Sequence, residues 1–325
     1  MIRRFDLAPL DGITKRVFRR VWHRHFGGAD RYFIPFVSPT DQHILTPRDR
    51  RELENPEGLP QVPQVMAKRG ADALWAAEAL ADMGYPEVNL NLGCPSGTVT
   101  AKGKGSGLLA DPDALDRFFD ELFSGARVPI SVKTRLGYHT PEEFPRLLEV
   151  FNRYPIACLT VHPRVRPEKY RGAVHMDAFA LAMAKSRNPV CYNGDLTSVA
   201  GVRTLESQFP GLEAVMIGRG AVADPALFRR LRGGPAATKE ELQAFTSELY
   251  RAYQDFYGQS APGNQAAPAS QRMKEVWFYL IHLFAGGERL GGRMRRSRGP
   301  EAYEELEARI FQELELLDAP LGALA

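Results

Sequence analysis

The residue with the clearest chemical potential is Cys94, which follows Asn91 and Gly93 in a turn between a polar strand end and a glycine-rich stretch. A thiol in such a turn is expected at an accessible rim, where it is a candidate reactive group. Cys158 and Cys191 lie in apolar runs instead, so we expect them to be small buried hydrophobic residues. Cys94 is therefore the candidate for chemistry.

Two cationic residues, Lys133 and Arg135, are expected at the same end of the folded chain as this turn. Lys133 and Arg135 are two residues apart on one expected strand, so their side chains share a face. A barrel interior tolerates buried cations only beside something anionic or electron-rich. A flavin satisfies that need, because a lysine stabilises the negative charge of the reduced ring. Lys133 as a Schiff-base lysine, or as the partner of a carboxylate, remains an equally open alternative.

Glycine-containing turns near the end of the strand pattern predict a phosphate site. Gly194 follows one strand, Gly218 and Gly220 follow the next, and Arg219 stands between the latter two. Each turn leads into a helix N-terminus, which favours an anion. The alternative is that these glycines only allow tight strand-to-helix turns.

The elements that position these residues alternate between strands and helices. Short apolar runs rich in β-formers predict eight strands, each followed by a helix. The strands are expected at Phe5–Pro9, Tyr32–Val37, Val62–Ala67, Glu87–Asn91, Pro129–Thr134, Ala157–His162, Pro189–Asn193 and Ala214–Gly218. Such alternation predicts an α/β fold, a (β/α)8 TIM barrel with its active site at the carboxyl ends of the strands.

Four helices of the barrel are expected in particular. They cover Ala71–Met83, Pro112–Phe123, Pro141–Tyr154 and Thr197–Phe209. Asp111 and Thr140 each precede a proline at the first helical position, so both are expected to be N-caps.

The strand pattern stops near Arg232, at a Gly-Gly-Pro punctuation. We expect a barrel domain over residues 1–232 and a small helical domain over residues 239–325. Its elements are expected at Lys239–Tyr257, a loop at Gly258–Ser270, Gln271–Phe284, a basic glycine-containing turn, and Pro300–Leu317. This appendage is too short to be a second catalytic domain.

Composition limits the class of protein. The net charge of +3 is too small to imply a polyanionic partner by itself. Three cysteines without a CxxC pair favour a reducing compartment. We see neither an apolar signal region, nor a run of about 20 apolar residues, nor a metal-binding histidine spacing. We therefore expect a cytoplasmic protein without a membrane span or metal.

Six motifs in order resemble those of the tRNA-dihydrouridine synthases. They are LAPLDGIT at 7–14, NLNLGCPS at 89–96, SVKTRLG at 131–137, VHPR at 161–164, NGD at 193–195 and IGRG at 217–220. The resemblance spans roughly residues 5–230, and NxGCP is its most specific part. Leu10 replaces the methionine that is usual in the family, and Pro163 follows His162.

The resemblance implies a barrel that holds FMN, a flavin reduced by NADPH, and hydride transfer from flavin N5 to C6 of uracil. Cys94 would be the general acid that protonates C5, a role that suits a protonated thiol. The implied FMN contacts are Pro9, Gln64, Lys133, His162, Asn193, Gly194, Asp195, Gly218 and Arg219. Asn91 and Arg135 would hold the uracil.

The resemblance also implies a tRNA substrate, whose target base must be extracted and stacked over the flavin. Lysine and arginine would hold the backbone phosphates without reading sequence. The candidates are Lys102, Lys104, Arg272, Lys274, Arg293, Arg295, Arg296 and Arg298, with Arg289 beside them. The arginine-rich run could instead be a solvated loop. We expect a monomer.

Three other functions compete. A small-molecule flavin reductase of the dihydroorotate dehydrogenase or ene-reductase type would share Lys133 and the phosphate turns, but it would not need a basic helical appendage. A flavin-free aldolase using Lys133 predicts a colourless protein. An RNA-binding module that has lost catalysis would not need Cys94, Lys133 and His162.

Overall fold

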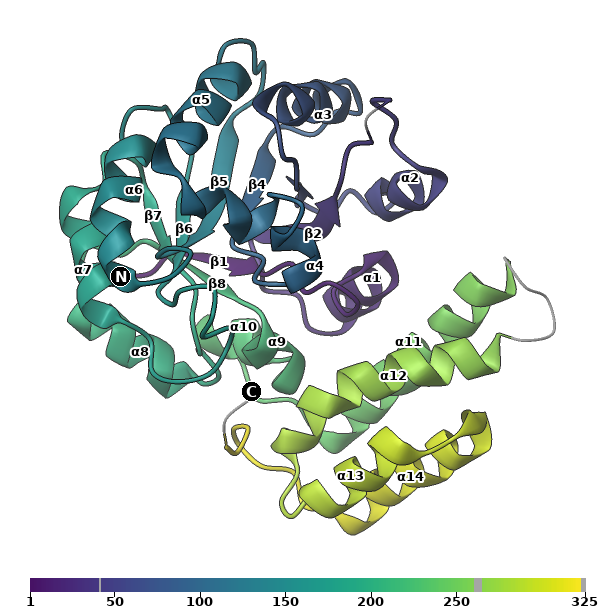
Figure 1. Cartoon of the computed structure of the whole chain (residues 1–325). Helices are drawn as coiled ribbons and strands as arrows, with labels where there is room; N and C mark the ends of the chain where they lie inside the picture. The colour runs from purple at the N-terminus through teal and green to yellow at the C-terminus, as the bar shows by residue number, and fades with distance from the viewer. Residues whose placement is uncertain (41, 260–264, 323–325) are drawn as a thin grey trace.

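The computed structural model describes residues 1–40, 42–259 and 265–322, and its first eight strands form one closed barrel in chain order (Figure 1). Every neighbouring pair is parallel, and β1 closes the barrel against β8. The strands are β1 (Arg4–Leu7), β2 (Arg31–Val37), β3 (Gln61–Val65), β4 (Val88–Leu92), β5 (Ile130–Arg135), β6 (Leu159–His162), β7 (Val190–Tyr192) and β8 (Ala214–Ile217). The predicted TIM barrel and all eight predicted strands are confirmed.

The barrel interior is filled by residues that alternate along the strands. One buried cluster contains Phe33, Val62, Cys158, Cys191 and Met216, together with two alanines. This is the packed core expected of an eight-stranded parallel barrel. The prediction that Cys158 and Cys191 are buried small residues is confirmed.

Helices cover the outside of the barrel. They are α1 (Arg16–His25), α2 (Pro47–Leu53), α3 (Gly70–Asp82), α4 (Gly97–Thr100), α5 (Pro112–Phe123), α6 (Phe144–Phe151), α7 (Met176–Lys185), α8 (Val199–Gln208), α9 (Arg219–Ala223) and α10 (Leu227–Leu231), with 3-10 turns η1 (Gly105–Ala110) and η2 (Pro141–Glu143). Asp111 caps α5 by accepting from the amides of Asp113 and Ala114, as predicted. Thr140 occupies the predicted N-cap position before Pro141, but the element that follows is a 3-10 turn and the Thr140 side chain makes no capping hydrogen bond.

Four further helices follow the barrel, of which the first packs against α1, the second packs against α9, and the last two pack against the second (Figure 1). They are α11 (Lys239–Gly258), α12 (Ala266–Leu280), α13 (Glu288–Arg296) and α14 (Gly299–Glu313), with η3 (Ile281–Leu283) after α12. Phe18 of α1 meets Phe245 of α11 edge-on, with ring centroids 6.1 Å apart. These contacts place α11 and α12 beside the barrel.

Two predictions for this region are wrong. The basic turn is helix α13, whose buried Leu290 and Met294 form an apolar stripe that leaves the arginines outside. The predicted loop at 258–270 is helical from Ala266, and its residues 260–264 lie outside the described residues, as do 323–325 at the end of the predicted second domain. A single antiparallel bridge joins Phe284 to Leu316.

No helix in the described ranges combines the length and apolar character needed to cross a bilayer.

Candidate active site

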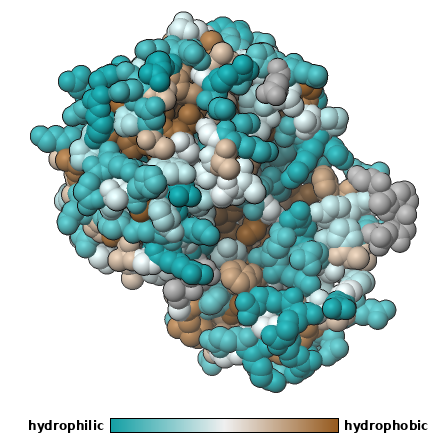
Figure 2. Space-filling view, in the orientation of Figure 1, coloured by the Kyte–Doolittle hydropathy of each residue, from teal (hydrophilic) through white to brown (hydrophobic). Residues whose placement is uncertain are grey.

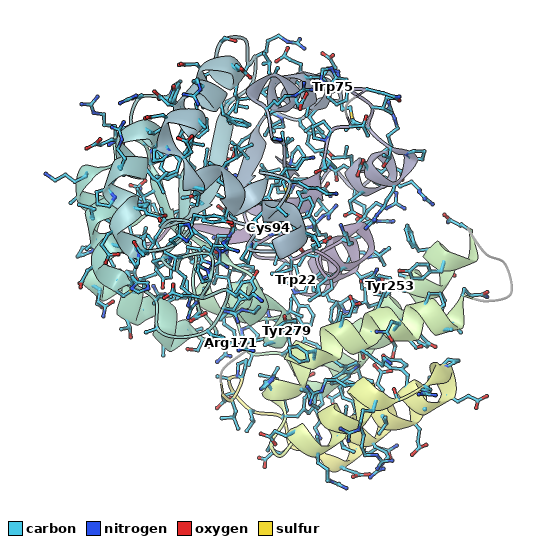
Figure 3. All side chains as sticks on the ribbon, in the orientation of Figure 1. Trp22, Trp75, Cys94, Arg171, Tyr253 and Tyr279 are labelled. Carbon is cyan, nitrogen blue, oxygen red and sulfur yellow. The ribbon has the colours of Figure 1, made fainter. Side chains whose placement is uncertain are left out.

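A cavity of about 810 Å³ opens at the carboxyl ends of the barrel strands. It is large enough for a cofactor and a substrate ring, since small-molecule sites span about 300–1,000 Å³. The predicted residues that line it are Pro9, Gln64, Asn91, Cys94, Lys133, Arg135, His162, Asn193, Gly194, Asp195, Gly218 and Arg219. Cys94 lies near the centre of this face in Figure 3, with Arg171 and Tyr279 toward the C-terminal helices.

Lys133 is a cationic side chain of the cavity whose charged form is strongly disfavoured by its surroundings. It lies opposite Asn91 of the neighbouring strand β4. Its side chain lines the cavity. Burial, reinforced by the neighbouring Arg135 charge, lowers its pKa to about 7. No ion pair or hydrogen bond to its ammonium is found among the residues that the structure describes. An anionic or electron-rich ligand would supply the missing partner.

His162 is held as a neutral donor by its neighbour Arg164. Burial, followed by the charges of Arg135 and Lys133, keeps the pKa of His162 well below its usual range. The Arg164 guanidinium lies 3.2 Å from Nε2. Because a guanidinium only donates, Nε2 accepts and the ring proton resides on Nδ1. His162 therefore offers one N–H, at Nδ1.

Asp195 joins two arginines at the rim. Its carboxylate pairs with Arg164 and, at 2.6 Å, with Arg219. The backbone of Asp195 has a φ of +43°, which is uncommon outside glycine. Asp195 thus links the guanidiniums of Arg164 and Arg219 at the rim of the cavity.

A hydrogen-bonded chain of amides fixes the floor of the cavity. Gln64 donates to the side chain of Asn89 at 2.8 Å, and Asn91 donates to Gln64 at 2.7 Å. The Asn91 carbonyl accepts the amides of Gly93 and Cys94 at 3.0 and 2.9 Å. Asn91 therefore shapes the turn that carries the thiol, and one of its amide protons remains for a ligand.

The thiol of Cys94 is half-buried and protonated at neutral pH. Burial raises its pKa, partly offset by a backbone hydrogen bond from Ser96 and by the nearby Arg135. Arg135 itself is anchored to the carbonyls of Gly93 and Val165, at 2.8 and 3.2 Å. Since a guanidinium has five donors, Arg135 keeps others for a carbonyl of a bound ring.

The excess of positive charge suits an anionic ligand. Two acidic side chains line the cavity, Asp11 and Asp195, against five cationic ones. Asp11 is paired with Lys15 at 2.8 Å, and Asp195 is shared by two arginines. The donor set fits a phosphorylated flavin: a buried ammonium, a neutral imidazole N–H and several guanidiniums that line the cavity.

The glycine turns serve the packing of the strand ends. A side-chain carbon at Gly220 would lie 2.0 Å from the carbonyl oxygen of Leu196, and one at Gly218 would lie 3.2 Å from the side chains of Ala8 and Leu10. The tight-turn alternative therefore accounts for Gly220 without a ligand. It leaves the phosphate site a prediction.

Replacing Gly220 with alanine should destabilise the protein by at least about 2 kcal/mol, because the backbone of the turn after β7 must move. Urea unfolding of both proteins measures this. Gly211→Ala is the matched control, since no atom lies within 4 Å of the carbon it would add. Equal stability of the Gly220→Ala variant would show that the two turns are not in contact.

The predicted RNA contacts lie outside this cavity. Lys102 and Lys104 flank the turn after α4, near Lys68, whose side chain lies 3.5 Å from the carbon that a residue at Gly103 would carry. The others are on α12 and after it: Arg272, Lys274, Arg293, Arg295, Arg296 and Arg298. Arg293, Arg295, Arg296 and Arg298 are exposed.

Sequence reasoning missed two tyrosines. Tyr170 stacks on His162 with centroids 6.0 Å apart, and the guanidiniums of Arg135 and Arg219 lie over its ring. Tyr279 reaches the same cavity from α12. Neither carries a signal in the sequence, because one sits in an irregular loop and the other depends on how α12 packs.

The family is shown by comparison with known proteins. The model of the family described as "Dihydrouridine synthase (Dus)" matches residues 6–275. The chain belongs to the dihydrouridine synthase family. Its members are flavin-dependent oxidoreductases built on a TIM barrel, and this chain is an enzyme of that family.

Several relatives cover most of the chain. A tRNA-dihydrouridine(16) synthase of Ralstonia nicotianae is 34% identical over 71% of this chain and 73% of its own. A probable tRNA-dihydrouridine synthase of Rhodobacter capsulatus is 32% identical over 78% and 80%. The tRNA-dihydrouridine synthase B of Proteus vulgaris is 29% identical over 93% and 92%. The last alignment includes the C-terminal helices.

Solved structures share the barrel at low sequence identity. Morphinone reductase superposes with a TM-score of 0.53 at 13% identity, covering 73% of this chain and 87% of its own. The old yellow enzyme from Trypanosoma cruzi gives a TM-score of 0.51 at 10% identity, covering 78% and 94%. These likenesses concern the fold alone.

No group of three or more His, Cys, Asp and Glu side chains placed to hold a metal ion occurs within the described ranges.

Proposed function

We propose that this enzyme reduces uridines in tRNA to 5,6-dihydrouridine, with FMN as its bound cofactor and NADPH as its reductant. The main support is that one cavity is lined both by Cys94, in the turn that follows β4, and by Lys133 of the neighbouring strand β5. Membership of the dihydrouridine synthase family and the tRNA substrate in the relatives' names agree with it.

Bound FMN would supply hydride from its N5 to C6 of the uracil. Lys133 and the His162 Nδ1–H would hold the electron-rich edge of the ring, because both are donors without another described partner on that atom. Arg164 positions His162. Arg219, with Gly194 and Gly218 in the adjoining turns, would hold the phosphate.

Pro9, Gln64, Asn193 and Asp195 complete the cofactor site. Asn193 donates to the carbonyl of Met216 at 2.8 Å, which ties the ends of β7 and β8 together. Asp195 organises the two guanidiniums beside it. Pro9 and Gln64 form walls of the cavity. Their contribution is to shape the pocket around the ring.

Asn91 and Arg135 would bind the carbonyl and imide edge of the uracil. Cys94 then delivers a proton to C5, and its raised pKa keeps that proton on sulfur at neutral pH. The target base would leave the tRNA stack to reach this depth.

The chain would divide into a catalytic barrel over residues 1–232 and an RNA-binding helical domain over residues 239–325. The exposed arginines of α13, with Lys102 and Lys104 on the barrel, would contact RNA phosphates. We expect a monomeric enzyme in the cytoplasm, where tRNA and NADPH are available.

The purified protein should be yellow, should bleach on addition of NADPH, and should be reoxidised without oxygen by unmodified tRNA as dihydrouridine appears. Absorbance near the flavin bands and mass spectrometry of digested RNA measure both steps. A colourless protein that FMN does not reconstitute would contradict the proposal and favour a Lys133 aldolase. Reoxidation by a small enone or orotate alone would favour a small-molecule reductase.

A further inference from the structure

A second cavity of about 500 Å³ adjoins the first on the side of the C-terminal helices. The two cavities share Asp11, Ile13 and Tyr279 in their linings. Figure 3 shows Tyr279 where α12 meets the barrel, and Figure 2 shows hydrophobic surface at this junction with hydrophilic residues around it. A ligand that fills the catalytic cavity can therefore continue into the second one.

The side chains that line the second cavity carry more positive than negative charge, because each of its acidic residues is already paired with a cation. Its acids are already compensated, Asp11 by Lys15 at 2.8 Å and Glu275 by Arg272 at 2.7 Å. Lys274 donates to the backbone of Ser297 at 2.9 Å and keeps its charge.

Two exposed arginines line the same cavity from different elements, Arg48 on α2 and Arg295 on α13. Neither forms an ion pair with a residue in the described part of the chain. An anion bound in the second cavity would therefore have Arg48 on the side of the barrel and Arg295 on the side of the C-terminal helices.

An aromatic ring stands beside these cations. Phe278 of α12 lines the second cavity and is half-buried. The Arg295 guanidinium lies 5.8 Å from its ring centroid, and Tyr279 meets it edge-on at 4.9 Å. Consecutive residues of a helix point about 100° apart, so Tyr279 reaches the catalytic cavity while Phe278 faces the second.

We propose that the second cavity binds the nucleotide next to the target uridine, with its base stacked on Phe278 and its phosphate held between Arg48 and Arg295. This inference rests on the proposed function, because it takes the catalytic cavity to hold a uridine of an RNA strand. Base stacking on an aromatic ring beside arginine tolerates any base, so the site holds the strand without reading its sequence.

RNA is the occupant that the geometry favours over the dinucleotide reductant. Arg48 and Arg295 are exposed residues that line the cavity, so a polymer that extends beyond the cavity can contact them from solvent. The cavity is also continuous with the one that takes the target base, as adjacent nucleotides require. If a dinucleotide occupied this cavity instead, replacing Phe278 would impair reduction of the flavin by NADPH. That half-reaction is measured separately from tRNA binding.

The test uses the FMN-loaded enzyme and unmodified tRNA transcripts. The modified position is first mapped on the wild-type product, and transcripts lacking the base on the 5′ or the 3′ side of it are then made. Phe278→Ala should weaken tRNA binding roughly tenfold. On one of the two abasic transcripts, wild-type binding should fall by about the same factor, and Phe278→Ala should cause no further loss.

Arg48→Ala should weaken tRNA binding and lower the salt dependence of the association constant by about one ion. Arg50→Ala is its control, because Arg50 is exposed on the same helix but does not line the cavity. Phe256→Ala on α11, another half-buried aromatic outside the cavity, is the control for Phe278→Ala.

Unchanged tRNA affinity in Phe278→Ala would overturn the inference. So would a Phe278→Ala variant that loses affinity on both abasic transcripts as strongly as it does on the intact one. A raised KM for NADPH with normal tRNA binding would assign the cavity to the dinucleotide and overturn it as well. Failure of tRNA to reoxidise the wild-type flavin would overturn the proposed function itself. That result is distinguishable, because it appears without any substitution in the second cavity.

Discussion

Replacement of Cys94 by alanine should lower dihydrouridine formation on tRNA by about 10³-fold, within the range lost when a general acid is removed. In this proposal Lys133 and Arg135 are donors to the cofactor and to the uracil, so neither replaces the thiol as the proton source. FMN binding and its reduction by NADPH should stay within about twofold of the wild type, because Cys94 belongs to the substrate side of the cavity in this proposal.

The measurement separates the two half-reactions by stopped flow: bleaching by NADPH, then reoxidation by tRNA without oxygen. Ser96→Ala is the matched control, since Ser96 is exposed in the same turn and its hydroxyl is hydrogen-bonded to that of Thr98. Only its amide reaches Cys94, and alanine keeps that amide. Wild-type product formation by Cys94→Ala would remove this thiol from the mechanism.

The fold was largely predictable from the sequence, because most barrel strands are short runs rich in apolar residues and several helices begin at a recognisable cap. Pro112–Phe123 was predicted to the residue since Asp111 is a strong N-cap before a proline. The helix after Thr140 was predicted too early. Its first three residues form a 3-10 turn, a choice of hydrogen-bond pattern that spacing alone does not determine.

The arginine-rich segment shows why the C-terminal region was harder. Gly291 and Gly292 suggested a turn, yet α13 is helical. A side-chain carbon at Gly291 would lie 3.0 Å from Ile281, so the glycine there allows close helix packing. Such contacts between distant segments leave no local trace in the sequence.

The residues of the cavity that lie at the ends of strands were predictable from the sequence. Gln64, Asn91, Lys133 and His162 follow directly from strand positions, because parallel strands of a barrel all end at one mouth. Tyr170, Tyr279 and the second cavity could not be found in this way. They depend on a loop conformation and on the docking of α12, which tertiary packing decides.

The second large effect is expected at Lys133, whose replacement by methionine should weaken FMN binding at least about tenfold. Its ammonium is a charged donor without a partner among the described residues, and a charged donor to a ligand is worth more than about 1.4 kcal/mol. Fluorescence titration of the apoprotein with FMN measures the loss. Arg117→Met, an arginine on α5 that does not line the cavity, is the control.

Proton linkage makes this prediction specific to the charge of Lys133. Its pKa is about 7 in the folded apoprotein against an ordinary 10.5, so between these values the unfolded chain binds more protons than the folded one. The unfolding free energy of the apoprotein should therefore rise with pH across that interval. An anionic ligand raises the pKa again, so FMN binding near pH 8.5 should take up a proton.

Calorimetric titrations in buffers of different ionisation enthalpy detect this uptake. In Lys133→Met both the uptake and the corresponding part of the pH dependence should vanish, and the apoprotein should be more stable than the wild type at pH 7, because an unpaired buried cation is gone. Proton uptake that persists in Lys133→Met would place the titrating group elsewhere. An apoprotein destabilised by the substitution would mean that Lys133 is already paired without its ligand.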